Sequence, residues 1–182
     1  MEPIEALKRR EEAAIHWLVD SFSDRLLKAA TLILSDQHLA EDAVQDCFVD
    51  AIANLESFRG ESSVYTWLYT ILLRRCYQLR RKNSQQLILS TEVIDGVLTR
   101  QGTHSSGPDT EADWVFRNAV KKLKYKYREV IVLFYYAEFS INEIAKLLGA
   151  PEGTIKNRLY RARRQLRNVL EKEDGHVFKS AF

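Results

Sequence analysis

The sequence predicts an all-α protein in which two small helical domains are joined by a flexible linker. Only 7 glycines and 3 prolines occur among 182 residues, so most of the chain is free of helix-breaking residues. Apolar side chains recur at helical spacing on both sides of a middle segment that contains Gly, Pro, Ser and Thr. We therefore expect an N-terminal domain at residues 1–83, a linker at 84–110 and a C-terminal helix-turn-helix domain at 111–182.

The N-terminal domain shows three helical stretches. Apolar residues spaced every three or four positions predict helices over residues 11–22, 38–55 and 64–82. Asp36 is suited to be the N-cap of the second helix, because its carboxylate can accept hydrogen bonds from free amides of the first turn. Residues 58–63 interrupt the apolar pattern and are expected to form a loop.

The middle segment has the composition of a linker. It contains Gly96, Gly102, Gly107 and Pro108 together with several Ser and Thr. Such a composition disfavours regular structure. Short apolar pieces within it indicate that parts of the linker rest on another surface.

The C-terminal domain is predicted to hold four helices, at residues 111–123, 127–137, 141–148 and 152–170. Gly149 is suited to end the third helix in a left-handed conformation. Pro151 is suited to begin the fourth helix, where no backbone donor is needed. Two helices joined by such a tight turn predict a helix-turn-helix, whose second helix enters the major groove of DNA.

The last helix separates into two faces when it is projected at 100° per residue. The predicted buried stripe consists of Ile155, Leu159, Ala162 and Leu166. The opposite face carries Asn157, Tyr160, Arg161 and Arg164, flanked by Lys156, Arg158, Arg163 and Arg167. Hydrogen-bonding side chains suit base edges and the flanking cations suit phosphates. A merely solvated basic helix is the alternative, which the preceding short helix and glycine turn disfavour.

The N-terminal domain changes charge along its length. No Lys or Arg occurs from residue 29 to 58, where carboxylates make an acidic surface that suits a basic protein partner. The next helix carries Arg74, Arg75, Arg80, Arg81 and Lys82. Aromatic residues are interleaved with them at Phe58, Tyr65, Trp67, Tyr69 and Tyr77. Rings and cations together suit unpaired nucleic acid, although Trp67 and Tyr69 could equally belong to the core.

Charge and composition restrict the function classes. Residues 111–182 carry 15 basic and 9 acidic side chains, which favours a polyanion partner for the C-terminal domain. The two cysteines form no CxxC pattern, which excludes a disulfide framework and fits a reducing cytosol. No signal peptide or apolar run long enough to span a membrane is visible, so we expect a cytoplasmic protein without membrane insertion.

The order of these features resembles the extracytoplasmic-function (ECF) subfamily of bacterial RNA polymerase sigma factors. The resemblance rests on four stretches: AEDAVQDCF at residues 40–48, Phe58 with WLY at 67–69, YREVI at 127–131 and GTIKNRLYRAR at 153–163. It implies an initiation factor that binds core RNA polymerase, recognises and melts promoter DNA, and is controlled by an anti-sigma factor, which in this family is often membrane-anchored.

The resemblance also implies roles for individual residues. The polymerase-binding positions are Glu41, Asp42, Gln45, Asp46 and Phe48. The −10 element positions are Phe58, Arg59, Ser62, Ser63, Tyr65, Trp67, Arg74, Arg75, Gln78 and Arg81. The −35 duplex positions are Thr154, Lys156, Asn157, Arg158, Tyr160, Arg161, Arg163 and Arg164. Family members commonly carry Asn at the position of Arg74 and an acidic residue near Gln78, so the resemblance carries no −10 sequence preference.

Two alternatives from other classes remain open at this point. A one-component helix-turn-helix regulator would need a sensor pocket or dimer interface in residues 1–83, and co-purification with core polymerase would distinguish it. An enzyme acting on nucleic acid would need clustered ligands or an acid–base pair. The four histidines are scattered and no HExxH, P-loop or GxSxG motif occurs. We therefore expect no catalytic activity, no metal and no cofactor.

Overall fold

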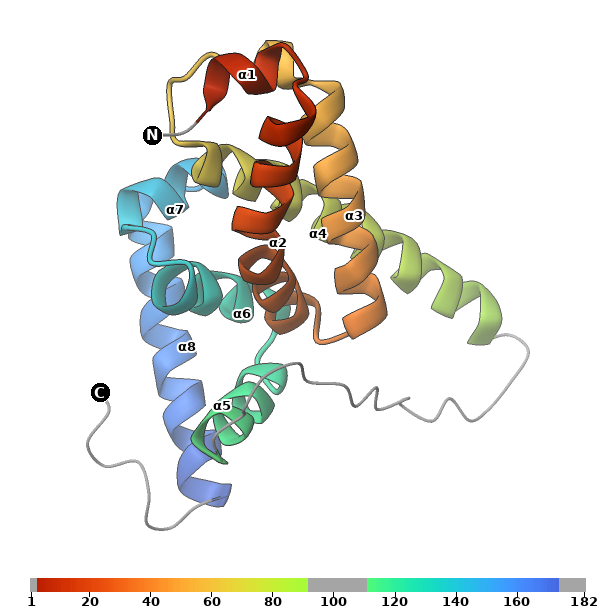
Figure 1. The fold of residues 1–182 in the computed structure, drawn as a ribbon. Helices are drawn as coiled ribbons and strands as arrows, with labels where there is room; N and C mark the ends of the chain where they lie inside the picture. The colour runs from red at the N-terminus through yellow and green to blue at the C-terminus, as the bar shows by residue number, and fades with distance from the viewer. Residues whose placement is uncertain (1–2, 92–110, 174–182) are drawn as a thin grey trace. The chain divides into compact units, whose positions relative to one another are not determined.

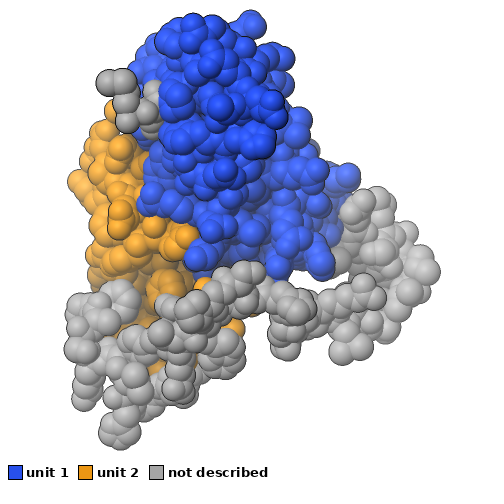
Figure 2. All heavy atoms as spheres, in the orientation of Figure 1, with its two compact units in different colours: residues 1–102 blue, residues 103–182 orange. Residues whose placement is uncertain are grey.

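The computed structural model describes the backbone of residues 3–91 and 111–173, and these contain helices but no strand (Figure 1). The chain divides into two compact units, residues 1–102 and 103–182 (Figure 2). The predicted all-α class with two helical domains is therefore confirmed. Residues 92–110, which make up most of the expected linker, lie outside the described residues.

The described part of the first unit, residues 3–91, contains three long helices and two short elements. They are α1 (Ile4–Lys8), α2 (Glu12–Leu34), α3 (Gln37–Ala53), the 3-10 turn η1 (Leu55–Ser57) and α4 (Val64–Thr91). Helices α2, α3 and α4 pack against one another pairwise, as their neighbouring ribbons in Figure 1 show.

The core of the first unit follows the periodicity of its helices. On α2 the buried side chains recur at Ala14, Leu18, Phe22 and Leu26. The buried residues of α3 are mostly small: Ala40, Ala43, Val44, Cys47, Phe48 and Ala51. Small side chains let α2 and α4 approach α3 closely, which brings polar groups at the helix edges within reach of each other.

The helix boundaries agree with the sequence in part. The Asp36 carboxylate accepts a hydrogen bond from the Leu39 amide at 3.0 Å, which confirms Asp36 as the N-cap of α3. Helix α1 was not expected, because five residues are too few to show a periodicity. Helix α2 continues to Leu34 and α4 to Thr91, both beyond their expected ends. Tertiary packing sustains α2 over this length, since Leu26 and Ile33 are fully buried.

The second unit contains α5 (Glu111–Lys121), α6 (Tyr125–Ile131), the π-helical turn η2 (Val132–Tyr136), α7 (Ile141–Leu147) and α8 (Glu152–Glu173). Helix α8 is packed against α5, α6 and α7. Its buried side chains are Ile155, Leu159, Ala162, Leu166 and Leu170. The predicted apolar stripe of the last helix is therefore confirmed and lengthened by one turn.

The helix expected over residues 127–137 is divided in the structure. Regular α-helix ends at Ile131, and the Ala137 amide donates to the Val132 carbonyl at 2.9 Å, the five-residue spacing of a π-turn. Val132 and Leu133 are both buried, whereas Tyr135 is exposed. The widened turn thus keeps two consecutive apolar side chains in the core and presents the ring of Tyr135 at the surface.

The turn between α7 and α8 has the expected form. Gly149 adopts φ +58°, a left-handed conformation that costs glycine nothing because it has no Cβ. The Pro151 carbonyl accepts hydrogen bonds from Thr154 and Ile155 at 2.9 and 3.2 Å, which begins α8. These contacts fix the direction in which α8 leaves the turn.

Candidate nucleic-acid and protein interfaces

The surface of α8 bears cations that have no internal counter-ion. Asn157, Tyr160, Arg161 and Arg164 are all exposed, as the helical projection predicted, and Tyr160 retains 66% of its accessible surface. Thr154 and Arg158 are half-buried at the edges of this face. Among the described residues, five arginines of α8 take part in no ion pair: Arg158, Arg161, Arg163, Arg164 and Arg167. Their charges are therefore available to an external polyanion.

The first turn of α8 is tied to α7 by Glu152. Its carboxylate accepts a hydrogen bond from the Asn142 side-chain amide at 2.9 Å and lies 3.5 Å from the Lys156 ammonium. The Asn142 hydrogen bond, followed by the charge of Lys156, holds the pKa of Glu152 below its ordinary value. Lys156 is thus the one predicted −35 cation in the described part of α8 that already has an acidic neighbour.

A capping box begins the first helix of the helix-turn-helix. The Ser140 hydroxyl accepts a hydrogen bond from the Glu143 amide, and the Glu143 carboxylate accepts one from the Ser140 amide at 2.9 Å. The Glu143 carboxylate also accepts a hydrogen bond from the Ser140 hydroxyl at 2.7 Å. These hydrogen bonds, the hydroxyl's first, lower the pKa of Glu143.

The aromatic residues of α4 occupy two different faces. Tyr65 and Tyr69 face α2: the Tyr65 ring lies 6.0 Å from that of Phe22, and the Arg25 guanidinium lies 4.7 Å above it. Trp67 instead packs against the buried ring of Phe58, with 5.0 Å between the ring centroids. Tyr69 is fully buried, whereas Tyr65 and Trp67 are half-buried. Trp67 is therefore partly accessible on a face that Phe58 supports from inside.

The loop before α4 is exposed and held by short-range contacts. Residues 59–63 are all exposed, and Gly60 adopts φ +73°. The Ser63 hydroxyl accepts a hydrogen bond from the Thr66 amide at 3.1 Å and thereby caps the first turn of α4. Arg59 lies 3.9 Å from Glu61 in an exposed pair, which leaves both side chains accessible.

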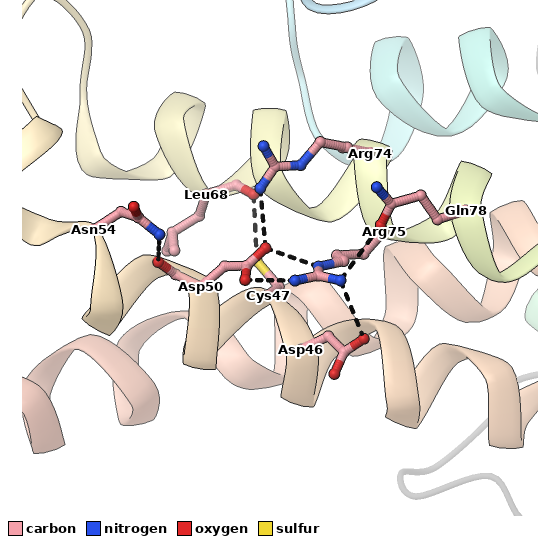
Figure 3. Close-up of polar contacts among 8 residues, drawn as sticks. All are labelled: Asp46, Cys47, Asp50, Asn54, Leu68, Arg74, Arg75 and Gln78. Carbon is pink, nitrogen blue, oxygen red and sulfur yellow. Dashed lines mark hydrogen bonds and ion pairs between the residues drawn. The ribbon is translucent and has the colours of Figure 1, made fainter.

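An ionic cluster joins α3 to α4 (Figure 3). The Asp50 carboxylate lies between two guanidinium groups: Arg74 Nη2 is 2.9 Å from Oδ2, and Arg75 Nε is 2.7 Å from the same oxygen. Arg75 Nη2 donates a further hydrogen bond to Asp50 Oδ1, and Arg75 Nη1 lies 3.7 Å from Asp46. The hydrogen bonds from Arg75, then the one from Arg74, hold the pKa of Asp50 below its usual range. Two cations expected to face DNA are thus held by a carboxylate of the acidic helix.

Helix α3 presents a narrow exposed strip beside this cluster. Glu41, Asp42 and Gln45 are exposed, and Asp46 is half-buried next to Arg75. Val49 follows on the same strip with 61% of its surface accessible. Val49 is not among the polymerase-binding positions implied by the resemblance, because an apolar side chain beside Cys47 and Phe48 gives no sign in the sequence that it is exposed.

Cys47 lies behind the ionic cluster and is chemically inert. Its thiol is buried and donates to the Leu68 carbonyl at 3.4 Å. Burial, followed by the charge of Asp50, raises the pKa of Cys47 to about 12, so the thiol stays protonated at neutral pH. Cys76 is also buried. Both cysteines are thus buried and free of a disulfide bond.

No group of three or more His, Cys, Asp or Glu is arranged to hold a metal ion within residues 3–91 and 111–173. In the same residues no helix is long and apolar enough to cross a bilayer.

Comparison with known proteins identifies the family. Residues 18–86 match the Sigma-70 region 2 family, and residues 114–166 match Sigma-70, region 4. The ECF RNA polymerase sigma factor SigW of Bacillus subtilis is 32% identical over 180 residues, covering 92% of this chain and 94% of that protein. This chain belongs to the ECF sigma factors. Sigma factors bind core RNA polymerase and promoter DNA to initiate transcription, so the function implied by the sequence resemblance is confirmed.

Further relatives support the same family. The ECF sigma factor EcfG of Rhodopseudomonas palustris is 32% identical over 172 residues, covering 88% of this chain and 91% of that protein. Among solved structures, the sigma factor RpoE of Bartonella quintana in complex with the anti-sigma factor NepR has a TM-score of 0.72 and 28% identity. That match covers 90% of this chain and 98% of the other.

The family match assigns region names to the units described above. Region 2 spans most of α2, all of α3 and most of α4, and it contains the acidic strip, the exposed loop and the ionic cluster. Region 4 spans most of α5, then α6, η2 and α7, and α8 as far as residue 166. The predicted −10 and polymerase-binding residues thus share region 2, and Asp50 links the two groups. Asp50 was missed as a site residue because the sequence does not reveal which carboxylate faces α4.

Proposed function

We propose that this sigma factor divides promoter recognition between its two units. Region 4 reads the −35 element as duplex DNA through α8, and region 2 captures unpaired bases of the −10 element beside the loop at residues 59–63. The observation that carries the proposal is the face of α8, where unpaired arginines surround Asn157 and Tyr160 on a helix whose opposite stripe is buried. Such a helix can enter a major groove without losing its own packing.

The −35 contacts divide by chemistry. Asn157 and Arg161 lie on the exposed face and carry the side chains suited to bidentate contacts with base edges. Cations on the flanks, including Lys156 and Arg158, suit phosphate oxygens. The base contacts supply discrimination between promoters, while the phosphate contacts supply affinity that falls with salt.

The −10 contacts centre on the loop and the first turns of α4. Trp67 offers a half-accessible ring for base stacking, and Phe58 acts through it as a packing support. Arg59, Ser62 and Ser63 are exposed beside it. Arg81 is exposed and has no ion pair among the described residues, so it is the cation of α4 that we place against the DNA backbone.

The exposed strip of α3 is the proposed polymerase contact. Glu41, Asp42 and Gln45 present an acidic and polar surface that a basic partner surface complements. Phe48, which the resemblance also places among the polymerase-binding positions, is buried in the core. We therefore propose that it supports this strip from behind.

Melting of the promoter needs both units and the polymerase together. Neither unit alone supplies enough stacking energy to unpair a duplex, because unstacking costs a few kcal/mol per step and stacking on a ring returns about 1–3 kcal/mol.

We further propose control by an anti-sigma factor. The RpoE structure similar to this chain holds such a protein, NepR, and RpoE matches over 90% of this chain. We also propose that this sigma factor acts in the cytoplasm. We assign it no enzymatic activity and no cofactor, because RNA polymerase performs the catalysis and the sigma factor selects the promoter.

Reconstituted transcription tests the proposal. The full chain is mixed with bacterial core polymerase and a promoter library of random sequence between −40 and +1, and transcribed templates are sequenced. We expect transcripts that start from templates sharing two conserved blocks, and weak DNA binding by the free chain at physiological salt. Core polymerase without the chain is the control. Tight, sequence-specific promoter binding by the free chain, or no dependence of transcription on the chain, would contradict the proposal.

A further inference from the structure

Arg163 differs from the other arginines of α8 in its surroundings. Its guanidinium carbon lies 5.5 Å from the ring centroid of Phe134 and 5.5 Å from that of Tyr135. The two rings are 5.0 Å apart with their planes at 78°, so they form a corner that receives the guanidinium. Both rings come from η2, the π-helical turn outside the helix-turn-helix.

The arrangement leaves the hydrogen-bonding edge of the guanidinium open. A guanidinium stacks on rings through its face and donates hydrogen bonds in its plane. Within the part of the chain that the structure describes, Arg163 makes no hydrogen bond and no ion pair. Arg163 and Tyr135 are both exposed, so the corner is accessible from solvent.

The position of Arg163 on α8 determines which groups of a bound DNA its guanidinium N–H donors can reach. At 100° per residue, Arg163 shares a flank with Lys156 and Arg167, between the buried stripe and the face that carries Asn157. Tyr160 lies next to this flank. When the exposed face of a recognition helix lies against base edges, cations on its flank lie against the phosphates that border the groove.

We propose that Phe134 and Tyr135 are positioning residues that hold Arg163 as a phosphate clamp for duplex DNA. The inference rests on the proposed −35 function of α8 and adds the π-turn to the DNA interface. The rings restrict the rotamers of a long side chain before DNA arrives, so less conformational freedom is lost when the phosphate binds. The contact between Arg163 and the DNA backbone is thereby positioned by two rings of η2, which themselves contact no base in this proposal.

The test uses the complete sigma factor bound to core polymerase and a promoter fragment selected by the wild-type holoenzyme. Binding is measured between 50 and 200 mM salt for the variants Arg163→Ala, Tyr135→Leu, Tyr135→Phe and the double variant Tyr135→Leu with Arg163→Ala. Tyr135→Leu removes the ring at an exposed position, so the core of region 4 is left intact. Tyr135→Phe keeps the ring and is the matched control.

We expect Arg163→Ala to reduce the slope of log affinity against log salt by about 1. Tyr135→Leu should weaken binding about two- to fivefold, lower the same slope, and have no further effect when Arg163 is already Ala. Tyr135→Phe should behave as wild type. A wild-type slope for Tyr135→Leu, or an equal loss in the presence and absence of Arg163, would overturn the inference.

The outcome also separates this inference from the proposed function. If Arg163→Ala lowers the salt slope but Tyr135→Leu does not, region 4 binds duplex DNA and the rings have no positioning role. If the wild-type holoenzyme selects no promoter at all, the proposed function itself is wrong.

Discussion

The carboxylate of Asp50 on α3 accepts hydrogen bonds from both the Nε and the Nη2 of Arg75 on α4. Arg74 donates to the same carboxylate from the preceding position, at 2.9 Å. Asp50 retains only 16% of its side-chain surface, so water screens the pair weakly. The helix that we assign to polymerase binding and the helix that we assign to −10 capture are therefore connected by one carboxylate.

The first prediction concerns the stability of region 2. Asp50→Ala removes the shared acceptor and leaves two guanidinium groups facing each other, so we expect a loss of about 1–3 kcal/mol of unfolding free energy. Asp42→Ala is the matched control, because Asp42 is exposed on the same helix and has no ion pair among the described residues. Its effect should be within about 0.5 kcal/mol. Hydrogen exchange of α3 and α4 amides measures both, and equal protection in the two variants would contradict the prediction.

The second prediction concerns acid. The folded-state pKa of Asp50 is lowered from its ordinary value of 3.8, chiefly by hydrogen bonds from Arg75. A lowered pKa contributes stability above the ordinary value, and this contribution is lost as pH falls through the folded-state pKa. The stability difference between wild type and Asp50→Asn should therefore be constant from pH 7 to about 5 and shrink below about 4. Urea unfolding at each pH measures it, and a constant difference down to pH 2 would refute the linkage.

The third prediction concerns promoter choice. If Arg161 contacts a base, Arg161→Ala should cost about 1–3 kcal/mol of binding and relax the preference at one −35 position. Arg167→Ala is the control on the same helix, since Arg167 lies on the phosphate flank and also has no ion pair among the described residues. It should weaken all promoters alike. Sequencing of transcripts from a promoter library distinguishes them, and an unchanged −35 preference in Arg161→Ala would remove the base contact.

The fourth prediction concerns the capping box. Ser140→Ala removes the hydroxyl that accepts from the Glu143 amide, and this should destabilise α7 by about 1 kcal/mol. Loss of the hydroxyl should also raise the pKa of Glu143 toward its ordinary value, because the Ser140 side chain is the largest cause of its shift. Ser140→Thr keeps the hydroxyl and should keep both properties. Faster exchange of first-turn amides in Ser140→Ala alone is the expected readout, and equal exchange in both variants would contradict it.

Local patterns predicted much of the fold and the two faces of α8. The stripe from Ile155 to Leu166 and the opposite face around Asn157 follow from a spacing of 3.6 residues, which is a property of one helix. Asp36 and Gly149 were identifiable for the same reason, since a cap or a left-handed turn depends on the residues beside it. The sequence alone therefore determined the long helices of region 2, the caps at Asp36 and Gly149, and the exposed basic face of α8.

The tertiary structure decided which polar and aromatic side chains have partners on a neighbouring helix and which remain exposed. Asp50 and Arg75 are separated by 25 positions in the chain, and only the packing of α3 on α4 brings them together. The same packing turns Tyr65 toward α2 and leaves Trp67 on another face. The π-turn, which no periodicity signalled, carries the rings around Arg163. Periodicity fixes a side chain's direction on its own helix, whereas its partner depends on where a distant helix crosses.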